Sequence, residues 1–554
     1  MKKSSTARVA AVCLLMGGMK AAWAAEPVKV SSDDILNILI QQGVIDEKKK
    51  DEVIRRAKER TRQQYQSGVE TVPASKADVS PPGDPSVVRV PYVPQYIKDD
   101  IRDKVRTDLR EDVVDDVMKK AEQERWGIPG TAPDWTQRIK FSGDVRLRGE
   151  SVMFAEGNEP QTYKNYNVVN KEGGTNAAGP DAYYNTTEDR ARLRTRMRVG
   201  MKANVTTGVE AGMRLATANS SNPVSTNETL GDYGKSFDLQ MDRAYLKYTS
   251  FAKDIMLVGG RFENPFLVTD LIWDSDLQFD GIAGSYYWLR DSGWESEDRQ
   301  WDPFVRAGLF PVDEFELSDD DKWLIGGQVG FEYHTWEQDV FRLGVGYYHY
   351  KNMPGTKNAV DDVTFDFTAP DSFQKGNTVF NIHNSSDPSA EDELFALAFD
   401  YHIADILIQY DMATFSPYHI VLTAEYIENV GADEDEALAR AFPSGAIADE
   451  DAAAVATSKD GYLVKAMFGW PIMAKPGDWQ VALSYRELGA DAAIDAFADS
   501  DFHLGGTDSR GYVFEGSYGL LNEVWMTAKW MSSNEIDEAT LGVDILQIDL
   551  NARF

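Results

Sequence analysis

From about residue 138 onward, hydrophobic and polar positions alternate along the chain with a period of two. In the first such segment, Ile139, Phe141, Val145 and Leu147 interleave with charged or hydroxyl side chains. A β-strand places successive side chains on opposite faces, so this pattern predicts strands with one apolar and one polar face. We expect about sixteen strands, with 14 or 18 left open. They begin near residues 138, 188, 208, 237, 254, 278, 301, 321, 339, 392, 418, 459, 477, 508, 522 and 541.

The connections between these segments alternate between long and short. If the first strand runs outward, the long outer connections are 151–187, 218–236, 265–277, 311–320, 353–391, 430–458, 489–507 and 534–540. Short inner connections include 205–208, 249–253, 336–339, 471–477 and 520–521. Two further inner links, 289–300 and 403–417, are longer than the scheme expects. Short turns at one end and long loops at the other are typical of an all-β, antiparallel transmembrane β-barrel.

Five arginines occupy every second position from Arg190 to Arg198, in the order R-A-R-L-R-T-R-M-R. On a strand, neighbours in this row lie ~6.7 Å apart, and each pair repels by ~0.6 kcal/mol in water or ~2.5 kcal/mol at an effective dielectric of 20. A water-filled barrel lumen can hold such a row, whereas an ordinary soluble sheet is destabilised by it. By parity, the first three strands direct more bases than acids inward, which leaves a wall of about +6.

Parity along the strands predicts a basic wall and, facing it, an acidic connection. The wall comprises Lys140, Arg146, Arg148, Arg190, Arg192, Arg194, Arg196, Arg198, Arg214, Arg243 and Arg261. In and just after the third outer connection lie Asp270, Asp274, Asp276 and Asp280. If this connection folds into the barrel, it narrows the lumen and its acids and the wall produce a transverse field. In the alternative, these aspartates only cap and brace the turns of the connection, and acids on adjacent strands neutralise the arginines.

The chain before the barrel divides into four parts. Residues 1–25 carry basic residues, an apolar core and a small-residue exit, which predicts a secretory signal peptide. We expect a helical segment at 26–66, a proline-rich linker at 67–95 and a helix at 96–130, all in the periplasm, and the barrel at 136–554. The single cysteine, Cys13, lies in the predicted signal peptide, so the mature chain has no disulfide and no thiol nucleophile.

Charge and motif content exclude several classes of function. Without residues 1–25, the chain has 53 basic and 90 acidic residues, which argues against nucleic-acid binding. The mean hydropathy is −0.42, and no stretch approaches the ~18 apolar residues of a membrane-spanning helix. The six histidines are scattered, and neither a G-x-S-x-G motif nor a metal-ligand spacing occurs. We therefore expect neither an enzyme nor a metal or other cofactor. The acidic outer connections are either solvated loops or sites for divalent cations near lipopolysaccharide.

Several segments resemble the bacterial putative porin family, whose members are outer-membrane barrels with a short helical periplasmic segment. They are V-P-Y-V-P-Q-Y-I-K-D-D-I-R at 90–102, G-D-V-R-L-R-G-E at 143–150, G-R-F-E-N-P-F at 260–266, W-D-S-D-L-Q-F-D-G at 273–281, A-E-Y-I-E-N at 424–429 and D-S-D-F-H-L-G-G-T-D at 499–508. The chain also ends on Phe554 after an alternating strand, which resembles the assembly signal of such proteins. The resemblance implies contact with outer-membrane lipid, lipopolysaccharide and the barrel assembly machinery. Porins commonly form trimers, so a homo-trimer is consistent with it.

Together these features predict a Gram-negative outer-membrane porin that allows passive diffusion of small hydrophilic solutes. Its water-filled pore would have a basic wall facing an acidic constriction loop. The alternative is a structural outer-membrane protein with a plugged barrel, tethered to the envelope by its periplasmic helices.

Overall fold

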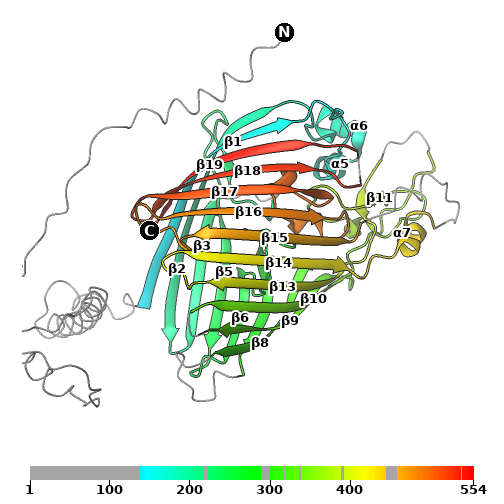
Figure 1. Cartoon of the computed structure of the whole chain (residues 1–554). Helices are drawn as coiled ribbons and strands as arrows, with labels where there is room; N and C mark the ends of the chain where they lie inside the picture. Colours follow the sequence, from blue (N-terminus) through cyan, green and yellow to red (C-terminus); the bar gives the residue numbers. More distant parts are fainter. Residues whose placement is uncertain are drawn as a thin grey trace, which may run out of the picture. The chain divides into compact units, whose positions relative to one another are not determined.

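The computed structural model describes residues 138–554 except 218–221, 289–299, 317, 336–337, 388–391, 444–457 and 538. The predicted signal peptide, the segments at 26–66 and 96–130 and the linker at 67–95 lie outside the described residues. The described chain folds into a closed antiparallel β-barrel of 16 strands (Figure 1). These are β1 (Ile139–Phe154), β2 (Arg190–Thr206), β3 (Val209–Thr217), β5 (Leu239–Thr249), β6 (Ile255–Glu263), β7 (Gln278–Tyr286), β8 (Trp301–Asp313), β9 (Lys322–His334), β10 (Val340–Lys351), β13 (His402–Met412), β14 (His419–Asn429), β15 (Asp460–Gly469), β16 (Trp479–Leu488), β17 (Ser509–Leu521), β18 (Val524–Asn534) and β19 (Val543–Arg553).

Each strand pairs with the next along the chain, and the barrel closes where β19 pairs with β1. Pairing runs from Asp144 opposite Arg553 to Phe154 opposite Val543. Phe554 extends this seam, because its N–H donates to the Gly143 carbonyl at 3.0 Å and its carbonyl accepts from the Gly143 N–H at 2.8 Å. The antiparallel barrel and its strand number, both predicted from alternation, are confirmed.

The tenth strand was predicted to begin near residue 392, and this position is wrong. That region contains the short β12 (Phe395–Leu397), which pairs with β11 (Val379–Asn381) in a separate two-stranded sheet. The tenth barrel strand, β13, begins ten residues later at His402. Alternation misled here because Leu397 and Phe399 are apolar for burial in an outer connection, not for a membrane face. With β13 placed correctly, the link to β14 shortens to residues 413–418.

The strands present apolar side chains outward around the barrel. On β2, Leu193 and Met197 are 62% and 42% exposed, whereas Arg196 between them is only 7% exposed. Leu246 on β5 and Ile282 on β7 are likewise exposed large apolar residues. A closed barrel with such an outer surface has no unpaired strand edge and offers hydrocarbon contacts all round, as insertion into lipid requires.

Helices in the described part of the chain are short and lie in the long connections. They are α5 (Tyr166–Glu172), α6 (Thr175–Ala178) and α7 (Glu434–Ala441), with 3-10 turns η4 (Gly179–Ala182), η6 (Asp366–Thr368), η7 (Asp495–Phe497) and η8 (Phe502–Leu504). A two-residue strand, β4 (Glu228–Thr229), pairs with β2. Among the helices that the structure describes, none has the length and apolar character needed to cross a membrane.

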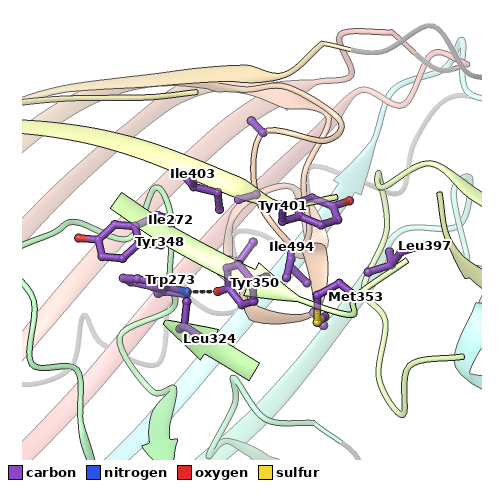
Figure 2. Close-up of a cluster of buried hydrophobic side chains, with 14 of the residues drawn as sticks. Ile272, Trp273, Leu324, Tyr348, Tyr350, Met353, Leu397, Tyr401, Ile403 and Ile494 are labelled. Atoms are coloured by element: carbon purple, nitrogen blue, oxygen red, sulfur yellow. Dashed lines mark hydrogen bonds between the residues drawn. The ribbon is translucent and has the colours of Figure 1, made fainter. Parts of the chain in front are cut away.

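The hydrophobic core lies inside the barrel, where the connection 264–277 packs against the inner face of β6–β10. Its centre is Trp273, whose ring lies 4.6 Å from that of Tyr348 and 5.2 Å from that of Phe279. The Trp273 indole N–H donates to the Tyr350 hydroxyl at 2.9 Å, so its polar atom is satisfied in an apolar environment (Figure 2). Gln328 on β9 fixes the same connection by donating to and accepting from the backbone of Leu267, both at 2.8 Å. This connection is therefore part of the folded interior.

Candidate functional site

Three arginines of the ladder on β2, Arg192, Arg196 and Arg198, are paired with acids on β1. The register places Asp144 opposite Arg198 and Glu150 opposite Arg192. The Arg198 Nε donates to Asp144 at 2.8 Å, and the Arg192 Nε donates to Glu150 at 2.5 Å. Asp144 also accepts from Arg196 at 2.8 Å. Opposite charges at these cross-strand positions stabilise the pairing of β1 with β2.

The centre of the ladder has the opposite arrangement, with cations facing cations. Arg146 lies opposite Arg196, and Arg148 lies opposite Arg194. Like charges at directly opposite positions destabilise a sheet unless other groups compensate them. Part of the compensation comes from β19 on the far side of β1, where Asp549 lies opposite Arg148. Its carboxylate accepts from the Arg148 Nε at 2.8 Å and from Nη2 at 2.9 Å, a bidentate pair.

Asp276 in the third outer connection contacts the ladder directly. It accepts from the Arg198 Nη1 at 3.0 Å and lies 3.8 Å from the Arg196 Nη1. The Thr226 hydroxyl donates to its second oxygen at 2.9 Å. Burial alone would raise the pKa of the Asp276 carboxyl, but Arg196 and Arg198 hold that pKa below its usual value. Asp276 is therefore an ionised acid that bridges the connection and the basic wall.

Asp274 has a different role from its neighbour. Its carboxylate accepts backbone N–H groups from Asp276 at 2.7 Å and from Ser500 at 2.8 Å. Its pKa is raised well above the usual value by burial and by the nearby charges of Asp499 and Asp276. Asp274 thus braces the connection and joins it to a second one.

The remaining residues of the predicted site are dispersed. Asp270 lies 3.9 Å from the Arg486 guanidinium, and Asp280 lies on β7 rather than in the connection. Three of the predicted bases pair with acids close by: Arg214 with Asp242, Arg243 with Glu263, and Arg261 with Asp280. The side chains of Lys140 and Arg190, at the two ends of the wall, form no ion pair or hydrogen bond with described residues.

A second outer connection, 489–508, also enters the barrel, which the sequence reasoning missed. We call its residues 499–501 the crosspiece. At one end, the Asp499 carboxylate accepts from the Arg486 Nη1 on β16 at 2.8 Å. At the other, both oxygens of Asp501 lie 2.8 Å from the Arg148 Nη1 on β1. The crosspiece therefore links β16 to β1, which are separated by β17, β18 and β19 in the closed barrel.

Ser500, in the middle of the crosspiece, is held by two other connections. Its N–H donates to Asp274, and its hydroxyl donates to the Val224 carbonyl at 3.1 Å. A further backbone bond from the Asp274 N–H to the Phe497 carbonyl, at 2.9 Å, joins the connections 264–277 and 489–508. Three connections thus form one hydrogen-bonded layer across the lumen.

Two glycines explain how the connection 489–508 packs so closely. Gly505 and Gly506 adopt φ values of +95° and +92°, which side chains disfavour. A Cβ at Gly506 would lie 2.0 Å from the Lys375 carbonyl oxygen, so only glycine allows this approach. The signal in the sequence is the segment D-S-D-F-H-L-G-G-T-D at 499–508, where alternate acids precede a glycine pair. By itself, the segment 499–508 has the composition of an ordinary polar loop.

Two cavities lie on either side of the crosspiece. The outer cavity, of about 510 Å³, is bounded by long connections, and the inner cavity, of about 750 Å³, lies toward the short turns. Arg190, Arg192 and Arg194 line the outer cavity. The inner cavity is lined by Arg146, Arg148 and Arg196. Ser500 and Asp501 line both cavities, so the ladder passes the crosspiece from one cavity to the other.

The inner cavity carries charges of both signs. Lys465 on β15 and Lys529 on β18 line it, and their ammonium groups form no ion pair or hydrogen bond with the described residues. Asp270 and Glu515 also line it. Among all the described residues, including those of this cavity, no group of three or more His, Cys, Asp or Glu side chains is arranged to hold a metal ion.

The inner cavity is eccentric in the barrel. Its strand residues come from β1, β2 and β13–β19, and no described residue of β3 or β5–β10 contributes to it. The aromatic core packs against the missing side, where a separate cavity of about 490 Å³, lined by residues such as Asp242, Arg261 and Lys322, also lies. The connection 264–277 lies between the aromatic core and the inner cavity: Phe266 and Trp273 belong to the core and border the cavity, and Asp270, Asp274 and Asp276 also line it.

The profile of the family described as Putative porin matches residues 30–554. Among solved structures, the barrel is similar to OprB of Pseudomonas putida, with 12% identity and a TM-score of 0.42 over 77% of this chain and 96% of that chain. It is also similar to the outer membrane channel DcaP of Acinetobacter baumannii, with 11% identity and a TM-score of 0.38 over 75% and 97% of the two chains. No curated protein sequence matches significantly. The chain therefore belongs to the putative porin family of bacterial outer-membrane β-barrels.

Proposed function

We propose that this porin allows small hydrophilic solutes to diffuse passively through the polar half of its barrel. The observation that carries the proposal is the pair of charged cavities, which share Ser500 and Asp501 as a common wall. A solute entering from the long connections would pass Arg190, Arg192 and Arg194, then the crosspiece, and then the inner cavity. No energy source or catalytic group is needed for this movement.

The charges around the crosspiece would act on the solute through a transverse field. The basic wall of β1 and β2 lies on one side, and the acids of the two inward connections lie on the other. Such a field orients dipolar and charged solutes and favours water over apolar molecules. Most of these charges are already paired within the protein, so a solute would be held weakly. Passage requires weak binding, because a tightly bound solute does not leave the channel.

Channel activity of purified protein in planar lipid bilayers tests the proposal. We expect stepwise current increases that depend linearly on voltage, because a fixed polar lumen conducts ions without a voltage-driven gate. The same protein unfolded by heat before addition serves as the control. If folded protein at high concentration gives no current steps, the proposal is wrong. The plugged, structural barrel would then be the better description.

A further inference from the structure

Arg148 binds two carboxylates that differ in how they are held. Asp549, on the adjacent strand β19, takes the Nε and Nη2 edge of the guanidinium. Asp501, in the crosspiece, takes the remaining Nη1 with both oxygens at 2.8 Å. The first carboxylate is fixed by the barrel wall, whereas the second belongs to a connection. The Nε and Nη2 edge of Arg148 is thus used to hold the barrel wall together, whereas Nη1 binds a carboxylate that comes from a loop.

The surroundings of the Asp501 carboxylate are those of an anion site. Besides Arg148, the Gln547 Nε2 donates to it at 3.1 Å. Burial would raise the pKa of the Asp501 carboxyl, but Arg148, Lys529 and Arg194 lower it well below its usual range. Lys529 has no ion-pair partner within the described residues and lines the same inner cavity. Arg148 and Gln547 thus donate to one partly buried carboxylate, and the charge of Lys529 acts on it from the same cavity.

The position of this site places it on the proposed route. Asp501 lines both the outer and the inner cavity, and Arg148 lines the inner one. A guanidinium donates two parallel hydrogen bonds to a carboxylate wherever the carboxylate comes from. An organic anion that reaches the crosspiece therefore meets donors that already hold a group of its own chemistry.

We propose that Arg148, Gln547 and Lys529 form a binding site for the carboxylate group of small organic anions, and that Asp501 occupies this site as an internal competitor. The inference rests on the proposed channel function. In this arrangement, a solute carboxylate displaces Asp501 from the Arg148 Nη1 as it passes. Asp501 then returns and releases it. By competing for Arg148, the Asp501 carboxylate shortens the time for which a solute stays bound. It thereby prevents the basic wall from retaining anions.

The test measures block of chloride current by succinate in planar bilayers. Two variants remove the competitor: Asp501→Asn keeps the size of the side chain, and Asp501→Ala also leaves room for the solute. Glu523→Gln is the matched control, since it removes the same negative charge from the same barrel. Glu523 pairs with Arg553 where β19 ends, its side chain is about half exposed, and it lines neither cavity. Retention of the folded barrel is checked by heat-modifiable migration on electrophoresis.

We expect both Asp501 variants to be half-blocked at succinate concentrations about tenfold lower than the wild type, because a charge-assisted bond to Arg148 becomes available. Glu523→Gln should stay within about twofold of the wild type, because it removes only an exposed ion pair. Equal strengthening in all three variants would mean that net charge alone acts, and no strengthening in the Asp501 variants would mean that no carboxylate site exists. Either result overturns the inference. Absence of any wild-type current would instead contradict the channel function itself.

Discussion

At the scale of single residues, the basic wall of β1 and β2 is stabilised by carboxylates from four different parts of the chain. Asp144 and Glu150 come from the neighbouring strand, and Asp549 comes from the last strand. Asp276 and Asp501 come from inward connections. Removing one member of a buried pair leaves the other charge uncompensated, at a cost of about 3–5 kcal/mol. The ladder is therefore both a functional candidate and a structural element of the barrel.

Replacing Arg192, Arg194 and Arg196 together with serine should shift the ion selectivity of the channel toward cations. The change removes three positive charges and leaves Glu150, Asp144 and Asp276 with fewer partners. The measurement is the reversal potential across a potassium chloride gradient. An unchanged potential would mean that the ladder charges do not reach the permeating ions.

The control for this experiment is Arg553→Ser. Arg553 pairs with Glu523 where β19 ends, and its side chain is about half exposed. It lines neither cavity. The variant thus loses a cation from the same barrel without changing the proposed route, and its reversal potential should match that of the wild type.

At the scale of elements, the connection 264–277 is anchored by its apolar residues in the aromatic core, and its acids lie along the inner cavity. Trp273 is 3% exposed in the aromatic core, and the adjacent Asp274 lines the inner cavity. The apolar residues attach the connection to β6–β10, and this attachment sets where the acids lie.

Trp273→Ala should therefore loosen the connection and disturb the channel. Removal of a fully buried tryptophan leaves a cavity and costs about 3–5 kcal/mol. We expect lower thermal stability and larger fluctuations of the open-channel current. Trp530→Ala is the matched control, because Trp530 is 42% exposed on the outer face of β18. If the open-channel current of Trp273→Ala fluctuates no more than that of the wild type, the other contacts suffice to hold the connection.

The connection 489–508 should respond to pH through Asp495. Burial and the nearby Asp491 raise the pKa of this carboxyl from 3.8 to about 7, although backbone N–H groups of Gln374 and Ala496 donate to it. Because the folded-state pKa is the higher one, the stabilising contribution is fully present below pH 3.8 and is lost as the pH rises through about 7. Above that pH, the folded connection holds a buried charge.

Hydrogen exchange measures this effect directly. After correction for intrinsic rates, amides of residues 489–508 should exchange faster at pH 8 than at pH 6. Asp495→Asn cannot ionise, and its exchange should be equal at the two pH values. A difference that persists in Asp495→Asn would assign the pH response to another group.

At the scale of the whole molecule, the proposed route follows the side of the barrel that lines the inner cavity. Cysteine substitution tests this, because the only native cysteine, Cys13, lies in the predicted signal peptide. Ser517→Cys on β17 lines the inner cavity, whereas Ala283→Cys on β7 lies in the aromatic core. A charged methanethiosulfonate reagent should react with the first and lower the conductance, and should leave the second unmodified. Equal reaction at both positions would contradict an eccentric route.

The barrel itself was largely predictable from the sequence, because each wall strand needs an apolar side for lipid and a polar side for the interior. Fifteen of the sixteen predicted strand starts lie within about two residues of an observed barrel strand. The failure near 392 involved an apolar segment buried in a connection, for which alternation has no separate signature. The same parity argument predicted an inward ladder, with Leu193 and Met197 facing outward.

By itself, the sequence determined the strands, the orientation of the ladder and its excess of positive charge, because these depend on neighbours two residues apart. Only the tertiary structure decided which distant acids meet the basic wall. Asp276 reaches Arg198, and Asp501 and Asp549 reach Arg148, through contacts that span up to 401 residues of chain. It also decided that the connection 489–508 enters the barrel and links β16 to β1, and that an aromatic core packs against β6–β10. Such contacts depend on how distant segments pack together, and no local pattern of hydrophobic and polar residues specifies them.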